Sequence, residues 1–205
     1  MKFVLIISLL FLSTLVFSQN DEAHTDSLVV DFTAKLDNRG IETYAVTKRY
    51  CLGEINIFKL GNEKICTSKS TYFSVYVFWQ EDGKNMIKKI DNCGLYLSVE
   101  LPDNMVMDFM DRNKDDIMMH PIKPYEIESK LGGPIRSTET YPCSRVLRYV
   151  SPDLSFDQSF DLFDLTNDAL EDNINYDYNN SLQALEFEKL LTLVISQVDD
   201  EFRRH

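Results

Sequence analysis

A run rich in aromatic and β-branched residues, at positions 71–80, constrains the fold of this chain more than any other stretch. Such side chains suit the pleated, buried surface of a β-strand. The dipeptide Asp82-Gly83 follows, and it is typical of a two-residue type I′ turn because both central residues of that turn need a positive φ. Residues 85–91 are therefore predicted to form the return strand of a β-hairpin.

A two-residue loop also sets the register of the hairpin, and it places Trp79 opposite Met86. Apolar side chains alternate onto both faces of the first strand, which predicts a central strand that is covered on each side. The face with Tyr72, Tyr76 and Phe78 has two interpretations. It is either an aromatic binding platform or ordinary core, and core is the usual place for such side chains.

Helical periodicity occurs near both ends of the chain. Leu28, Phe32 and Leu36 recur every fourth residue after Asp26, whose carboxylate suits an N-cap. A longer apolar stripe predicts a C-terminal helix that lies on the sheet. The stripe follows a cap at Asn180 or Ser181 and comprises Phe187, Leu190, Leu191, Val194, Ile195, Val198 and Phe202.

Further strand-like runs occupy residues 44–50, 54–60 and 95–101. With the hairpin they predict an α+β fold, in which an N-terminal helix and a long C-terminal helix pack on a mainly antiparallel sheet. The sheet is expected to have about five strands in a meander around the central hairpin. Residues 145–150 are one more candidate strand. A short helix is expected from Asp103, followed by residues 112–140 as mostly loop.

The chain begins with the pattern of a secretory signal peptide. Lys2 precedes an apolar run at residues 3–12, and Val16 and Ser18 suit the two positions that signal peptidase reads. Residues 1–18 are therefore expected to be removed, leaving a secreted or periplasmic protein. The apolar run ends too early for a retained membrane anchor, and no cysteine near the cut indicates lipidation.

The mature chain, residues 19–205, is long enough for one well-buried core, and we expect a single α+β domain. Its charge is unevenly spread: residues 34–149 carry 17 basic and 16 acidic side chains, whereas residues 153–201 carry one basic and 13 acidic. The overall charge of −12 argues against nucleic acid or an anionic membrane as a partner. Cations or a basic protein surface are compatible with the acidic segment at residues 153–180, although solubility explains the same charge.

Motifs for the common enzyme chemistries do not occur. Of the three histidines, His24 and His205 lie near the ends of the mature chain and only His120 lies far from both. The sequence has no nucleophile elbow, phosphate loop or dinucleotide fingerprint. No C-x-x-C motif indicates redox chemistry. A pair of carboxylates for glycoside hydrolysis is still open, because geometry and not spacing defines such a pair. We assign no catalytic residue, cofactor-binding residue or metal ligand.

Two clusters resemble metal-ligand sets without completing one. Thioether and imidazole groups select Cu(I), and they gather at Met105, Met107, Met110, Met118, Met119 and His120. Methionine is also the ordinary filler of irregular cores. Oxygen-bearing side chains alternate at Asn173, Asn175, Asp177 and Asn179 like the early ligands of a calcium loop. The glycine and the final glutamate of an EF-hand are missing, which leaves only a looser calcium site.

The four cysteines, Cys51, Cys66, Cys93 and Cys143, are an even number in an exported chain, which predicts two disulfides. Three pairings are possible. Proximity in the sequence favours Cys51 with Cys66 and Cys93 with Cys143. Four buried, unpaired cysteines are the alternative.

Taken together, these patterns predict an exported, soluble, non-catalytic interaction or accessory protein. A carboxylate-based hydrolase is the alternative interpretation. A metal-binding accessory protein, for calcium or copper, is the third.

Overall fold

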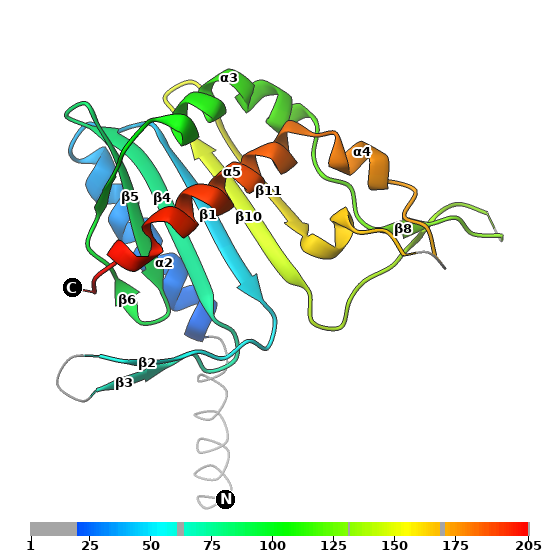
Figure 1. Cartoon of the computed structure of the whole chain (residues 1–205), viewed down its shortest axis with the longest axis horizontal. Coiled ribbons are helices and arrows are strands. Elements are labelled where there is room, and N and C mark those ends of the chain that lie inside the picture. Colours follow the sequence, from blue (N-terminus) through cyan, green and yellow to red (C-terminus); the bar gives the residue numbers. More distant parts are fainter. Residues whose placement is uncertain (1–19, 61–63, 131, 169–170, 205) are drawn as a thin grey trace, which may run out of the picture.

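The structure is a computed structural model that describes residues 20–60, 64–130, 132–168 and 171–204. A twisted antiparallel sheet lies between one helix on its first face and two helices on its second (Figure 1). The predicted signal peptide, with its cleavage after Ser18, lies outside the described residues. Within the described part of the chain, no helix combines the length and the apolar character needed to cross a bilayer.

The main sheet has the strand order β11-β10-β1-β4-β5-β6, with β7 also paired to β5. Its strands are β1 (Tyr44–Cys51), β4 (Phe73–Glu81), β5 (Lys84–Asp91), β6 (Gly94–Leu95), β7 (Val99–Leu101), β10 (Cys143–Val150) and β11 (Ser155–Asp161). The predicted α+β class is confirmed. The sheet has seven described strands where about five were expected: the β10–β11 hairpin adds two strands beyond β1, the run at residues 95–101 gives two short strands in place of one, and the run at residues 54–60 does not join it. The strand order is therefore not the expected meander, because β10 returns to pair with β1.

The central hairpin has the predicted register, with Trp79 opposite Met86. Asp82 and Gly83 adopt φ values of 53° and 75°, as a type I′ turn requires. β4 lies between β1 and β5, and both of its faces are buried. Trp79 itself is only 1% exposed.

The first face of the sheet is covered by α2 (Asn20–Asp37). The ring of Phe32 meets that of Trp79 edge to face, with 5.3 Å between the ring centroids. The helix begins before the expected cap, so Asp26 lies inside it and the predicted N-cap role is wrong. The carboxylate of Asp26 instead accepts a hydrogen bond of 3.1 Å from Lys48 on β1, which fastens the helix to the sheet.

The second face is covered by α3 (Met105–Met119) and α5 (Gln183–Val198). The predicted apolar stripe of α5 faces the sheet, and Tyr76 and Phe78 lie beneath it, so these aromatic rings are core and not a binding platform. α5 begins at Gln183, with Leu182 and not Asn180 or Ser181 as its N-cap. The residues before it form the short α4 (Tyr176–Asn180) and its C-cap.

Other expectations about the connections need correction. α3 runs to Met119, because Ile117 is still buried in the core, so the loop expected from residue 112 begins about two turns later. The run at residues 54–60 does not join the main sheet. It contributes β2 (Ile57–Lys59) to a two-stranded ribbon with β3 (Ile65–Thr67), drawn at the lower left of Figure 1. The remaining elements are β8 (Glu126–Ile127), β9 (Ile135–Arg136), η1 (Leu162–Leu165) and η2 (Asp199–Glu201).

Two disulfides are present, but the expected pairing is wrong. Cys51 is bonded to Cys143, and Cys66 to Cys93. The physical reason is the sheet topology: β10 returns to the edge of β1 in a register that places Cys51 opposite Cys143. Proximity along the chain could not reveal a partner 92 residues away. The second disulfide fastens the β2–β3 ribbon to the turn after β5.

The buried environment of Trp79 predicts a large loss of stability on truncation. Trp79→Ala should lower the free energy of unfolding by about 3 to 5 kcal/mol, because it empties the space between β4 and α2. Urea unfolding measures the change. Val30→Ala on the outer face of α2, where Val30 is 57% exposed, is the control and should change stability by less than about 1 kcal/mol. Equal losses in the two variants would contradict this packing.

Candidate functional site

The methionine cluster does not converge on one point. Met105 and Met119 stand at opposite ends of the 15-residue α3, which separates them by about 21 Å at a rise of 1.5 Å per residue. Met110 is fully buried in the core. The ring of His120 is exposed, with Nδ1 3.0 Å from the Asp116 carboxylate. The methionines therefore act as core filler or stand on the surface, and they do not form a copper site.

The alternating asparagines serve the backbone. Asn173, Asn175 and Asn179 are buried. The Asn179 amide donates to the carbonyl oxygens of Asp164 (2.8 Å) and Lys123 (2.9 Å), and the other two bond neighbouring backbone groups in the same way. Within the described part of the chain, no three His, Cys, Asp or Glu side chains gather closely enough to hold a metal ion.

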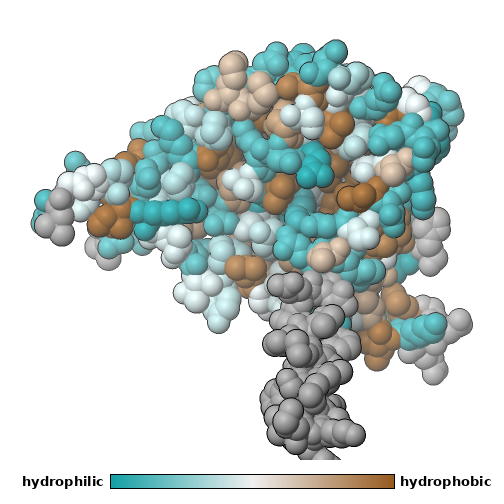
Figure 2. Space-filling view, turned by 180° about the vertical axis from the view of Figure 1, so that it is seen from behind, coloured by the Kyte–Doolittle hydropathy of each residue, from teal (hydrophilic) through white to brown (hydrophobic). Residues whose placement is uncertain are grey.

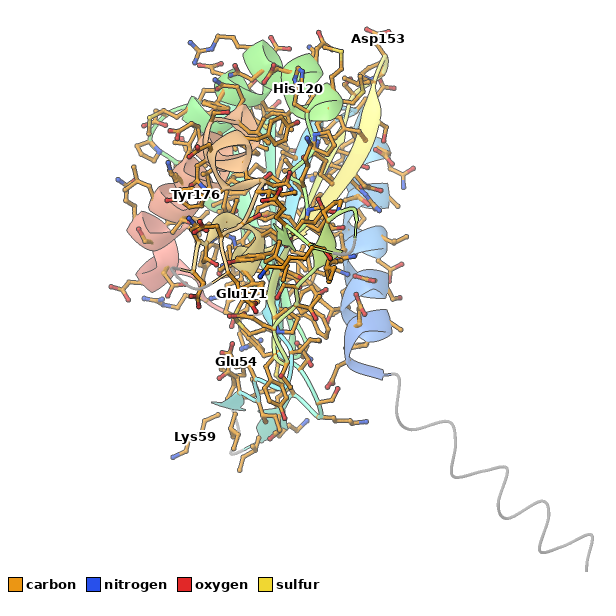
Figure 3. The ribbon with its side chains drawn as sticks, turned by 90° about the vertical axis from the view of Figure 1, so that its right-hand side faces the viewer. Glu54, Lys59, His120, Asp153, Glu171 and Tyr176 are labelled. Atoms are coloured by element: carbon orange, nitrogen blue, oxygen red, sulfur yellow. A yellow bond between two sulfur atoms is a disulfide. The ribbon has the colours of Figure 1, made fainter. Side chains whose placement is uncertain are left out.

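The acidic segment at residues 153–180 forms regular secondary structure despite the repulsion expected between its like charges. It forms β11, η1 and α4, and Asp157 pairs with Arg148 on the neighbouring β10 at 2.6 Å. The buried Asp164 carboxylate accepts the backbone N–H of Tyr125 at 2.8 Å. Figure 3 shows Asp153 and Glu171 well separated along the molecule. Binding of cations or a basic protein surface to this segment stays a prediction.

Three more carboxylates line a cavity at the start of α2, of about 510 Å³. Asp21 accepts the backbone N–H of Ser70 at 2.8 Å. Glu22 and Asp26 both accept hydrogen bonds from the ammonium group of Lys48. These acids fasten α2 to the sheet and to the loop before β4, an arrangement that does not favour a hydrolytic carboxylate pair.

A different cavity, of about 720 Å³, lies where β2, α2, β6 and the C-terminal residues meet. This volume lies within the usual range of ligand sites. Its described lining residues are Lys35, Lys59, Leu60, Cys93, Gly94, Leu95, Tyr96, Phe202, Arg203 and Arg204. Four of them are cationic and none is acidic, although the chain as a whole carries a charge of −12. We call this space the cationic cavity.

Separate elements bring these cations together. Lys35 lies in the last turn of α2, where a positive charge suits the helix dipole. Lys59 ends β2, on the ribbon that the Cys66–Cys93 disulfide ties to the sheet. Arg203 and Arg204 follow η2, and the Arg203 carbonyl accepts the backbone N–H of Leu97 at 2.6 Å, so the chain end runs beside β6.

One wall of the cationic cavity is held by a buried ion pair. Asp91 is fully buried, and its carboxylate accepts two hydrogen bonds from the Arg204 guanidinium, at 2.9 and 2.7 Å. It also accepts the hydroxyl groups of Tyr72 and Tyr96 at 3.1 Å each. Burial raises the pKa of both tyrosines, and the Asp91 charge raises it further. The tyrosines therefore stay protonated donors.

The guanidinium of Arg204 is also flanked by two rings, with its central carbon 4.8 Å from the centroid of Phe58 and 4.3 Å from that of Tyr96. Because Arg204 is paired with Asp91, the unbalanced positive charge of the described lining belongs to Lys35, Lys59 and Arg203. Removing one partner of such a buried pair typically costs about 3 to 5 kcal/mol. Arg204 is thus held in the wall by the ion pair and by both rings.

Lys88 adds positive charge behind this wall. Lys88 is only 4% exposed, and its ammonium group donates a hydrogen bond of 2.6 Å to the Tyr96 carbonyl. The ring centroid of Phe32 lies 5.0 Å away. Burial lowers the pKa of Lys88 to about 8, and the charges of Lys35 and Arg39 contribute.

The sequence contains one signal of this site, a lysine on a face of the hairpin that is otherwise apolar. In the predicted register Lys88 lies opposite Val77, on a face of the hairpin expected to be buried, and the structure has the same pairing. A lysine on an apolar face indicates a specific role for its charge. The other cations are distant along the chain, so their meeting has no local signature.

The lowered pKa of Lys88 predicts a specific pH dependence. Between pH 8 and 9.5 the unfolded chain keeps this proton while the folded chain loses it, so the free energy of unfolding should rise with pH. The expected rise is about 1 to 2 kcal/mol. Lys88→Met should remove it in urea unfolding, whereas Lys84→Met, at the exposed end of β5, should retain it. A rise of the same size in both variants would contradict the assignment to Lys88.

Comparison with known proteins identifies no relative of this chain. No protein family, curated protein or solved structure matches the chain. Its function must therefore be inferred from the chemistry of its own surface and cavities.

Proposed function

We propose that this protein is an exported, non-catalytic binding protein that holds an anionic group of its ligand in the cationic cavity. The observation that carries this proposal is the composition of the cavity wall. Its described lining residues include four cationic side chains and no carboxylate, in a chain that is otherwise strongly acidic. Lys88 adds a further cation behind the wall.

Electrostatics supports local capture of an anion. A unit charge about 5 Å from one cation gains about 1 to 3 kcal/mol for an effective dielectric constant between water and a protein surface. Several cations around one cavity act together. The acidity of the remaining surface repels anions, which restricts their binding to this cavity and makes it sensitive to salt.

Charge removal tests this proposal. Isothermal titration calorimetry with inorganic phosphate and with glutarate should detect binding to the mature protein. Lys35→Ala and Lys59→Ala should each weaken binding by about tenfold, the effect of about 1.4 kcal/mol. Lys189→Ala removes the same charge from the outer side of α5, where Lys189 is exposed, and should leave binding unchanged. Absence of binding at 10 mM of either anion, or an equal loss in the control, would refute the proposal.

Export is part of the same proposal and is supported by the signal-peptide pattern and by the two disulfides. The exported protein should begin at Gln19, because Val16 and Ser18 suit signal peptidase. Intact-mass measurement of the protein recovered outside the cytoplasm tests this. Retention of Met1 in that material would contradict cleavage.

The acidic segment at residues 153–180 is a second candidate for interaction. Glu171, Asp172 and Asp177 are exposed, and they are compatible with cations or a basic protein surface. This contact would use a different part of the protein from the cationic cavity. The two roles therefore do not exclude each other.

A further inference from the structure

We infer that the ligand of the cationic cavity is an extended acidic polypeptide segment that adds as a third strand to the outer edge of β2. The inference rests on the proposed function and deepens it, because it names the class of ligand. It combines three features of the β2–β3 ribbon: an unpaired edge, exposed isoleucines and nearby cations.

The hydrogen bonds of the ribbon define which backbone groups face outward. The backbone N–H of Leu60 donates to the Lys64 carbonyl at 2.7 Å, and that of Ser68 donates to the Asn56 carbonyl at 3.1 Å. In an antiparallel ladder, hydrogen-bonded pairs alternate with pairs whose N–H and C=O groups point away from the partner strand. The register between these two bonds therefore shows, for every residue of β2 and β3, whether its backbone N–H and C=O groups face the partner strand or point outward.

Ile57 and Lys59 occupy the alternate positions of β2, opposite Thr67 and Ile65. Their backbone N–H and C=O groups point away from β3, toward the outer edge of β2. Within the described part of the chain, no strand pairs with this edge. β2 contributes Lys59 to the lining of the cationic cavity, whereas no residue of β3 does.

Figure 1 agrees with this placement, because it shows β2 between β3 and the main sheet. On the opposite side of the cavity, the chain end already covers the edge of β6: Tyr96 and Arg204 form an antiparallel bridge. The space between this chain end and β2 has unpaired backbone groups on the β2 side and the Arg203 and Lys35 side chains at its wall.

The side chains of the ribbon indicate the chemistry of the segment. Ile57 is 68% and Ile65 66% exposed on the same face, and Figure 2 shows apolar surface on this part of the molecule, at the lower right. Lys59 projects at the lower end of the molecule in Figure 3, and Lys64 is exposed nearby. Exposed apolar residues beside cations fit a strand that carries both apolar and acidic side chains.

Strand addition explains more of these features than a small free anion does. Main-chain hydrogen bonds to a sheet edge supply affinity, and alternate side chains supply specificity. A small anion would use the cations but neither the unpaired edge nor the isoleucines.

A blocked eight-residue peptide of alternating valine and glutamate is the probe, and isothermal titration calorimetry is the measurement. Ile57→Pro removes an outward N–H and leaves the β2–β3 ladder intact, since an edge position tolerates proline. Binding of the peptide should weaken at least tenfold. Ile65→Pro is the matched control: it makes the same change at an equally exposed position on the edge that faces away from the cavity, and it should leave binding unchanged.

Phosphate binding separates this inference from the proposed function. Ile57→Pro should bind phosphate as the unmodified protein does, because the cations are unchanged. If phosphate binds and the valine–glutamate peptide does not, or if both proline variants lose peptide binding equally, strand addition is refuted while anion binding stands. If neither probe binds, both proposals fail.

A second measurement does not depend on the folding of a proline variant. A peptide whose alternate backbone nitrogens are methylated cannot donate to β2, so its binding to the unmodified protein should weaken at least tenfold. Equal affinity for the methylated and the unmethylated peptide would overturn the inference. A peptide in which glutamine replaces glutamate should also bind at least tenfold more weakly, and equal affinity for it would exclude an acidic ligand.

Discussion

Burial of β4 on both faces is the constraint on which the rest of the structure depends. Trp79 and Val77 face α2, whereas Tyr76 and Phe78 face α5, so one strand belongs to two cores. An antiparallel sheet that is apolar on both sides must be covered on both sides, because exposed apolar surface costs about 25 cal/mol per Å². The helices at the two ends of the chain provide that cover.

Residues 202–204, at the end of the described region, contribute both to the core and to the wall of the cationic cavity. Phe202 extends the core beyond α5. Two residues later, the guanidinium of Arg204 donates two hydrogen bonds to the buried carboxylate of Asp91. This pair, together with the bridge between Tyr96 and Arg204, holds the chain end beside β6 and forms one wall of the cationic cavity. Buried ion pairs contribute little net stability when compared with apolar packing, so the pair is better explained by the geometry that it imposes.

The distribution of charge follows from this geometry. Several acidic side chains bind other parts of the fold. Asp26 on α2 accepts a hydrogen bond from β1, Asp157 on β11 forms an ion pair with β10, and Asp164 accepts a backbone N–H group. The cations of α2, the ribbon and the chain end gather around one space. A protein with an acidic surface and one cationic cavity concentrates anions at that cavity and repels them elsewhere. This selectivity is the physical basis of the proposed binding role.

Local patterns were sufficient for the central hairpin and for the buried face of the last helix. The Asp82-Gly83 turn and the alternation along β4 determined the hairpin and its register, because both depend on residues only a few positions apart. The stripe of α5 likewise determined which of its faces is buried. Even here the caps of α2 and α5 were misplaced, since tertiary contacts decide how far a helix extends.

The sequence by itself thus determined the α+β class, the central hairpin, the buried face of the last helix and the presence of an even set of cysteines. Only the tertiary structure decided the disulfide partners, the separate β2–β3 ribbon and the cationic cavity. Cys51 is bonded to Cys143, and Lys35 and Arg203 line the same cavity, although long stretches of chain separate them. Such meetings depend on which strand pairs with which edge, and no pattern within a few residues encodes that choice.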